Sequence, residues 1–188
     1  MLVLATRNKH KIEELSPILR GLAWRAVDEK FFAEEGARSL MANALIKARK
    51  AREFCEPQDV SLGEDTGLFV EALKGEPGVL SSRYAGNSVS FEDNTEKLLK
   101  NLKGIVNAKR SAFFITACAC LFPDGKAVFS CGRLDGEIAL EPSGGGGFGY
   151  DSVFFVPGIN KTLAQICFEE KTKMSHRYKA MTALLPYL

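Results

Sequence analysis

The chain has 188 residues, 46% of them hydrophobic, which is enough for one substantial core, so we expect a single domain over residues 1–188. A net charge of +2 argues against a protein that holds nucleic-acid polymers by neutralising their phosphates, and favours a small anionic ligand. The longest apolar run, residues 112–122, is too short to span a bilayer, and no secretion leader is visible, so we expect a cytoplasmic protein.

The cysteine pattern favours neither a disulfide framework nor a zinc site. The number is odd, no Cys-x-x-Cys pair occurs, and no histidine lies nearby in the sequence. We expect these residues to be reduced and mostly buried. They are Cys55, Cys118, Cys120, Cys131 and Cys167.

The N-terminal segment predicts a strand over residues 1–5, a tight connection, and a helix over residues 11–22 with apolar positions at helical spacing. The connection is Thr6-Arg7-Asn8-Lys9-His10-Lys11. Backbone N–H groups at the helix start and several basic side chains favour phosphate binding there. The P-loop spacing is absent, and a capped helix with solvated lysines is the alternative.

A second helix is predicted to begin near Ser39, with an apolar inner side from Leu40 to Phe54. Its basic residues are expected on the solvent face. They are Lys47, Arg49, Lys50 and Arg52. Glu35, in the irregular stretch before this helix, reads as a loop carboxylate.

The stretch Ser61-Leu-Gly-Glu-Asp-Thr-Gly67 places two adjacent carboxylates, Glu64 and Asp65, between glycines after an apolar lead-in. We expect a strand that ends in an acidic turn. One or two carboxylates at a strand end, completed by substrate phosphates, suit Mg²⁺ and could polarise a water. A solvated turn is the alternative interpretation.

The middle of the chain alternates breakers, a helix and a hairpin. Residues 75–86 read as an excursion between strands, and residues 91–102 as a helix. Residues 111–122 and 127–140 are rich in β-branched and aromatic residues and flank Pro123-Asp124-Gly125. Asp-Gly between two such runs predicts a hairpin.

A glycine-rich loop, residues 142–151, precedes a predicted strand over residues 152–156. Phe148, Tyr150 and Asp151 offer aromatic faces and a carboxylate to a base, although a flexible tether is the alternative. Ser175 is the predicted N-cap of the last helix, with His176 and Arg177 in its first turn. Cations at a helix N-terminus oppose its dipole, so an anionic or carbonyl-bearing ligand could compensate them.

Together these features point to a magnesium-bound triphosphate and a purine that carries acceptors on its edge. Separate basic clusters around Lys11, Lys47 and Lys171 accompany the carboxylates. Donors from His176 and Arg177 suit a 6-oxo group, whereas the amino group of adenine would leave donors unpaired.

Five motifs resemble the inosine triphosphate pyrophosphatase family, in order from residue 2 to about residue 185. They are Thr6-Arg-Asn-Lys-His-Lys11, Gly63-Glu-Asp-Thr-Gly67, Pro77-Gly78 with Ser82-Arg-Tyr-Ala-Gly86, Gly146-Gly-Phe-Gly-Tyr-Asp151 and Ser175-His-Arg177. The resemblance implies an α/β fold with an elongated mixed β-sheet flanked by helices, two lobes with a central cleft, and a homodimer. It implies Mg²⁺-dependent hydrolysis of ITP, dITP and XTP to the monophosphate and pyrophosphate.

The resemblance also assigns roles to individual residues. Asp65 matches the proton acceptor and metal ligand, with Glu35 and Glu64 as acidic partners. Phosphate or substrate contacts are implied for Thr6, Arg7, Asn8, Lys9, His10, Lys11, Lys47, Thr66 and Lys171. Base contacts are implied for Phe148, Gly149, Tyr150, Asp151, His176 and Arg177.

The chain departs from the family pattern at three places. Many bacterial relatives have Asp at the position of Glu64 and Ser at that of Thr66, replacements that keep the functional group. Ala37-Arg38-Ser39 replaces the usual Gly-Thr-Phe, a change expected to affect capping. Two rival functions stay open: a pyrophosphatase of the septum-inhibitor-like family, and a nucleotide- or RNA-binding module without catalysis.

Overall fold

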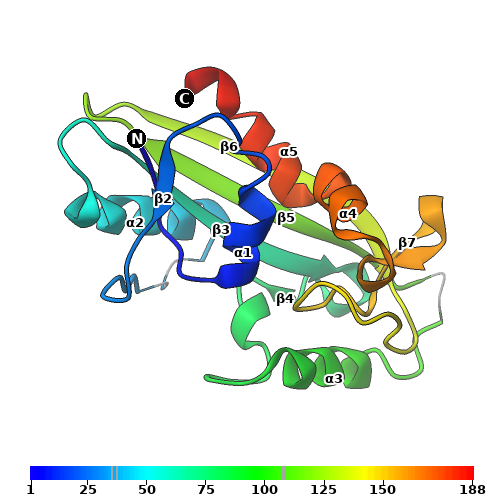
Figure 1. Ribbon diagram of the computed structural model, residues 1–188. Helices are drawn as coiled ribbons and strands as arrows, with labels where there is room; N and C mark the ends of the chain where they lie inside the picture. Colours follow the sequence, from blue (N-terminus) through cyan, green and yellow to red (C-terminus); the bar gives the residue numbers. More distant parts are fainter. Residues whose placement is uncertain (35, 37, 107–108) are drawn as a thin grey trace. The chain divides into compact units, whose positions relative to one another are not determined.

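The computed structural model describes residues 1–34, 36, 38–106 and 109–188 and has a mixed α/β fold (Figure 1). The described strands form an eight-stranded sheet in the order β2-β1-β3-β5-β6-β7-β8, with β4 paired to β3. The strands are β1 (Leu2–Leu4), β2 (Trp24–Ala26), β3 (Val60–Val70), β4 (Pro77–Gly78), β5 (Ser111–Leu121), β6 (Ala127–Ile138), β7 (Phe154–Val156) and β8 (Lys161–Thr162). The α-helices are α1 (Lys9–Leu15), α2 (Leu40–Ala51), α3 (Phe91–Asn101), α4 (Phe168–Met174) and α5 (His176–Thr182).

The chain divides into two compact units, each assembled from separate segments. Unit 1 comprises Met1–Thr66, Thr116–Gly132 and His176–Leu188, and unit 2 comprises Gly67–Ile115 and Arg133–Ser175. The long strands β3, β5 and β6 contribute residues to both units. The predicted mixed sheet flanked by helices is confirmed.

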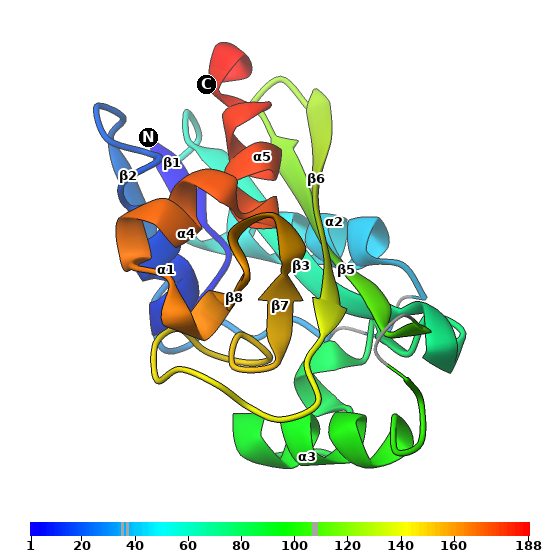
Figure 2. The same cartoon turned by 90° about the vertical axis from the view of Figure 1, so that its right-hand side faces the viewer.

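In unit 1, β1 lies between β2 and β3 and runs parallel to both, with Leu4 opposite Ala26 and Leu62. Both cartoon views place α2 on one side of these strands and α1 with α5 on the other (Figures 1 and 2). The core on the α1 and α5 side is aliphatic. Its fully buried members include Leu4, Leu15, Leu19, Leu62, Met181 and Leu184.

The first helix is shorter than predicted, since α1 ends at Leu15 and residues 16–21 form turns. Pro17 explains the early end, because proline lacks an N–H and its ring clashes with the carbonyl four residues earlier. The apolar spacing beyond this point still buries Leu19 completely. The predicted strand at the start of the chain is confirmed. The predicted start of the second helix near Ser39 is also confirmed, and the Ser39 side chain caps α2 by accepting from Ala42 N.

The prediction that the acidic segment forms a turn is wrong. It forms the middle of the eleven-residue strand β3. The glycines that suggested a turn instead allow close packing. A Cβ built on Gly63 would lie 2.0 Å from the backbone oxygen of Ala44 and 2.6 Å from the nitrogen of Ala48. Gly63 therefore lets the backbone of β3 approach α2 directly.

The helix at residues 91–102 and the hairpin are confirmed. Ser90 and Asp93 form a capping box at the start of α3. At the turn between β5 and β6, Phe122 N donates to Lys126 O at 2.9 Å, and Lys126 N donates to Asp124 Oδ1 at 2.9 Å. Asp-Gly was thus a sound hairpin signal.

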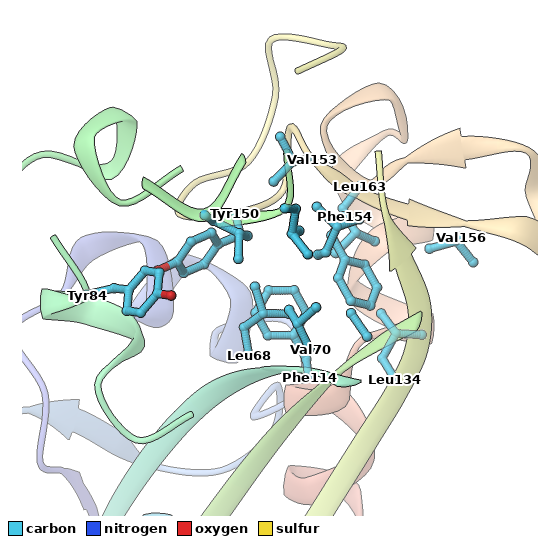
Figure 3. Close-up of a cluster of buried hydrophobic side chains, with 14 of the residues drawn as sticks. Leu68, Val70, Tyr84, Phe114, Leu134, Tyr150, Val153, Phe154, Val156 and Leu163 are labelled. Atoms are coloured by element: carbon cyan, nitrogen blue, oxygen red, sulfur yellow. The ribbon is translucent and has the colours of Figure 1, made fainter. Parts of the chain in front are cut away.

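Unit 2 has its own apolar core, in which aromatic rings are prominent (Figure 3). Phe154 is fully buried and its ring centroid lies 4.7 Å from that of Phe114. Tyr150 lies in the same cluster, with its hydroxyl donating to Ser81 O at 2.8 Å. β8 extends this unit by pairing antiparallel with β7 (Figure 2).

All five cysteines are free thiols, but the prediction that most are buried is wrong, because only two of the five are buried and Cys55 is half-buried. Cys118 and Cys120 are buried, whereas Cys131 and Cys167 are exposed. Within the described ranges, the helices are all too short or too polar to cross a membrane.

Gly63→Ala is expected to destabilise the protein by about 1–3 kcal/mol, because the added methyl group would have to displace the backbone of α2. Gly158→Ala is the control, since a Cβ at that position meets nothing within 4 Å. Urea unfolding of both variants measures the difference. Equal stability of Gly63→Ala and the wild type would contradict the close approach of β3 and α2.

Candidate active site at the edge of strand β3

The alternation of side chains along β3 separates the two adjacent carboxylates. Successive residues of a strand point to opposite faces of the sheet, so Glu64 and Thr66 share one face and Asp65 takes the other. Their hydrogen-bond partners are consistent with this alternation: Asp65 contacts residues of α2, whereas Glu64 and Thr66 contact Arg177 of α5. The two carboxylates therefore have different surroundings and different chemistry.

On the α2 face, Asp65 is held by two buried side chains. Lys47 Nζ lies 2.9 Å from Asp65 Oδ1, and Asn43 Nδ2 donates to Oδ2 at 3.0 Å. Only 7% of Lys47 is exposed, so the prediction that it lies on the solvent face of its helix is wrong. Its position, three residues after Ala44, puts it on the inner stripe with Asn43.

The ammonium group of Lys47 marks an edge of β3 that β1 does not cover. In the part of the chain that the structure describes, β1 pairs with β3 only as far as Leu62, whose carbonyl accepts from Ala5 N at 2.8 Å. The carbonyl of Glu64, two residues on, points to the same edge and accepts from Lys47 Nζ at 3.1 Å. A ligand at this edge could therefore reach side chains from both faces.

On the opposite face, Arg177 joins two carboxylates in a buried ion-pair network. Its Nε donates to Glu64 Oε2 at 2.9 Å, and its Nη1 pairs with Glu14 Oε2. Lys11 Nζ lies 2.7 Å from Glu64 Oε1. Glu14, Glu64 and Arg177 are each at most 4% exposed, so the two positive and two negative charges balance in a site with little water.

These charges set the ionisation of the network. Burial raises the pKa of the Glu64 carboxyl, but the positive charges of Arg177 and Lys11 outweigh it, so the pKa lies well below its usual range. For Arg177, burial lowers the pKa and the two carboxylates raise it, with a net increase. Both groups are therefore charged over the whole physiological pH range.

The loop from Thr6 to Lys11 begins where β1 ends. Asn8 caps α1, accepting from His10 N at 3.0 Å and from Lys11 N at 3.3 Å, and Thr6 Oγ1 accepts from Asn8 N at 3.2 Å. Arg7, Lys9 and His10 are exposed. Asn8 therefore satisfies N–H groups that the sequence suggested for phosphate, and the exposed basic side chains remain accessible from solvent.

His176 is 7% exposed, and its Nδ1 lies 2.6 Å from Thr116 Oγ1. Thr116 Oγ1 lies 2.7 Å from Thr66 Oγ1, which in turn accepts from Arg177 Nη2 at 3.2 Å. The imidazole and the ion-pair network are thus connected through two hydroxyl groups.

In unit 2, the glycine-rich loop is ordered around Asp151 rather than flexible. Asp151 Oδ2 accepts from Phe148 N at 2.8 Å and from Lys171 Nζ at 2.5 Å. Gly147 has φ +72°, and a Cβ there would lie 2.1 Å from Asp151 Oδ2. Only glycine allows this carboxylate to lie under the loop.

Of the two aromatic rings predicted to face a base, only that of Phe148 is partly exposed. Lys171 Nζ lies 5.1 Å from the centroid of the Phe148 ring, and the ring centroids of Phe91 and Phe148 are 5.9 Å apart. The ring of Tyr150 is in the core of unit 2 (Figure 3). Gly149 lies between them with φ +65°.

The structure therefore brings the predicted residues together in three groups. Within unit 1, Asp65 and Lys47 form one group, and Lys11, Glu64, Thr66, His176 and Arg177 form another on the opposite face of β3. Phe148, Asp151 and Lys171 form the third, within unit 2. Glu35 lies outside the described residues.

Sequence reasoning missed Glu14, Asn43 and Thr116. Glu14 and Asn43 each occupy the inner stripe of an amphipathic helix, where a polar residue signals a buried partner. That signal could have identified both. Nothing local marks Thr116, because its role depends on which side chain faces it from α5.

Glu64→Gln is expected to flatten the dependence of stability on pH. Because the pKa of Glu64 is lower in the folded state than its ordinary value of 4.5, the unfolded chain binds the proton first, and stability falls as pH decreases below that value. Urea unfolding at about pH 7 and about pH 3 measures this loss, which Glu64→Gln should reduce. Glu71→Gln, at an exposed position, is the control. The same loss in Glu64→Gln and the wild type would contradict the assignment.

Comparisons with known proteins identify the family of this chain. The sequence profile of the Ham1 family matches residues 2–187. The dITP/XTP pyrophosphatase of Caldanaerobacter subterraneus subsp. tengcongensis is 43% identical over 192 residues, which cover 100% of this chain and 95% of that protein. The dITP/XTP pyrophosphatase of Thermoanaerobacter pseudethanolicus is 40% identical, with coverage of 100% and 96%. The structure of the Staphylococcus aureus Ham1 protein matches with a TM-score of 0.87 and 35% identity over 99% of this chain and 96% of that one. The resemblance seen in the motifs is therefore confirmed, and the chain belongs to the Ham1 family.

Proposed function

We propose that this protein hydrolyses non-standard purine nucleoside triphosphates, namely ITP, dITP and XTP, to the monophosphate and pyrophosphate. Its full-length similarity to proteins named dITP/XTP pyrophosphatase supports this activity over a septum-inhibitor-like pyrophosphatase or a binding module without catalysis. The activity would remove these nucleotides from the pool. The structural observation that carries the proposal is the edge of β3 beyond its described pairing with β1, where Lys47 and Asp65 lie.

This edge has the charges that triphosphate hydrolysis requires. Lys47 lies at the edge on the α2 face, and Lys11 pairs with Glu64 on the opposite face, so we propose that both neutralise phosphate oxygens at this edge. Lys47 is paired with Asp65 and Lys11 with Glu64, so both ammonium groups are held in place before substrate binds. Preorganised charge of this kind stabilises a transition state without reorganisation during the reaction.

The donor set at Asp65 suits a magnesium ion. Each carboxylate oxygen accepts one hydrogen bond, from Lys47 or Asn43, and has a second lone pair for a metal. Mg²⁺ commonly binds through one or two carboxylates and completes its coordination with water and substrate phosphates, so a single aspartate can serve as its protein ligand. We propose Asp65 as the ligand, with Glu35 and Glu64 as its acidic partners. The bound ion would supply charge neutralisation at the phosphates.

Asp65 would also orient the attacking water and accept its proton. Its carboxylate is fixed by Lys47 and Asn43, so one of its oxygens can face the water in a constant direction. The lysines would stabilise the negative charge that develops on the leaving pyrophosphate.

The base would be recognised by donors and by an aromatic surface. By family resemblance, His176 and Arg177 donate to the 6-oxo group, and the loop from Phe148 to Asp151 contacts the ring. In unit 2, the partly exposed Phe148 ring with Lys171 beside it supports a stacking role. We further propose that the protein works as a homodimer in the cytoplasm.

Asp65→Asn is expected to lower the kcat for ITP more than tenfold, a barrier increase above about 1.4 kcal/mol, because the amide cannot accept the proton of water. Pyrophosphate release from ITP with and without Mg²⁺ measures the effect. Asp135→Asn, an exposed aspartate paired only with Arg133 in the described contacts, is the control. Retention of more than a tenth of the wild-type kcat by folded Asp65→Asn would refute the role of Asp65.

His176→Phe is expected to narrow the preference for ITP over ATP by removing ring donors while keeping a ring in a buried position. The ratio of kcat/KM for the two substrates measures the change, with the ATP rate as internal reference. A thermal unfolding scan verifies that the variant is folded. Equal losses on both substrates would count against base recognition by His176.

A further inference from the structure

The hydroxyl groups of Thr66 and Thr116 lie between two residues of the Ser175-His176-Arg177 motif. Thr116 is fully buried, and its Oγ1 lies 2.6 Å from His176 Nδ1 and 2.7 Å from Thr66 Oγ1. Thr66 Oγ1 accepts from Arg177 Nη2 at 3.2 Å. All four residues belong to unit 1. A continuous line of three hydrogen bonds therefore connects the guanidinium to the imidazole.

The chemistry of the groups gives this line a direction. A guanidinium can only donate, so Thr66 must accept at one end. Each hydroxyl carries one proton. If Thr66 donates to Thr116, then Thr116 must donate to His176 Nδ1, and every proton along the line has an acceptor. In the reverse order Thr66 would accept twice, and its own proton would have no acceptor among its contacts in the described chain.

We propose that Thr66 and Thr116 form a directed hydrogen-bond relay from Arg177 that makes His176 Nδ1 an acceptor and keeps the ring proton on Nε2. Thr66 and Thr116 are then positioning residues, because they act through His176 rather than on substrate. The ion pairs of Arg177 with Glu14 and Glu64 hold the start of the relay in place. A buried charge network on one side of the sheet thus sets the tautomer of a neighbouring imidazole.

The relay has a consequence for specificity, which rests on the function proposed above. With the proton on Nε2, His176 presents a donor on the ring atom opposite Thr116. A donor suits the 6-oxo group of hypoxanthine or xanthine and opposes the 6-amino group of adenine. Loss of the relay would free the ring to adopt the other tautomer, which presents an acceptor there.

The tautomer can be observed without substrate by long-range proton–nitrogen NMR of the imidazole rings. The chain has two histidines, so a spectrum of His10→Gln assigns the signals of His176. At about pH 8, where a free imidazole is neutral, we expect the Nδ1 resonance of a hydrogen-bonded acceptor and a proton on Nε2. A proton on Nδ1 in the wild type overturns the proposal.

Thr116→Val removes the hydroxyl while keeping the shape and strand preference of the side chain. We expect its Nδ1 resonance to move toward that of a protonated ring nitrogen, because the second tautomer becomes populated, and Thr116→Ser to restore the wild-type value. Thr182→Val is the matched control, because Thr182 Oγ1 donates to Tyr178 O on the same helix and lies outside the relay. An Nδ1 resonance that does not change in Thr116→Val overturns the proposal.

Kinetics then test the consequence for substrate. Thr116→Val should lower the ratio of kcat/KM for ITP to that for ATP by about three- to tenfold, the usual effect of one hydrogen bond, whereas Thr116→Ser and Thr182→Val should retain it. An unchanged ratio in Thr116→Val overturns the link to specificity. A wild-type protein that releases no pyrophosphate from ITP would instead refute the proposed function, and the NMR result would still decide whether the relay exists.

Discussion

The two-residue period of a β-strand is the constraint on which this site depends. Because Glu64 and Asp65 are adjacent in β3, they cannot share a face, and each meets a different helix. Asp65 meets the lysine and asparagine of α2, whereas Glu64 meets the arginine of α5. One strand thereby gives two adjacent carboxylates different partners on its two faces.

The ion pairs around Arg177 illustrate how buried charge can serve arrangement more than stability. A buried ion pair gains little over a hydrophobic pair of the same size, because both groups must lose their water. Here, however, Arg177 of α5 is paired with Glu14 of α1 and Glu64 of β3. Lys11, near the start of α1, pairs with Glu64 as well. The network therefore fixes the loop after β1 relative to the edge of β3, where the proposed phosphate groups would lie.

Much of this arrangement was visible in the order of residues. Strong local signals, such as the Asp-Gly turn and the apolar spacing of α2 and α3, correctly predicted elements because they depend only on neighbours in the chain. The early end of α1 was missed because Pro17 outweighs the apolar spacing beyond it. The acidic turn was wrong for another reason: glycine permits both a turn and a close contact, and only the neighbouring helix shows which is needed.

The sequence by itself determined the family and its chemical groups, since its motifs carry carboxylates, lysines and a His-Arg pair whose types do not depend on folding. Only the tertiary structure decided which of these groups meet. In the folded protein, Lys47 is buried, Tyr150 packs in the core of unit 2, and Thr116 is hydrogen-bonded to His176. Contacts such as these join residues up to 163 positions apart, as between Glu14 and Arg177, and depend on strand order and helix packing, which no local pattern encodes.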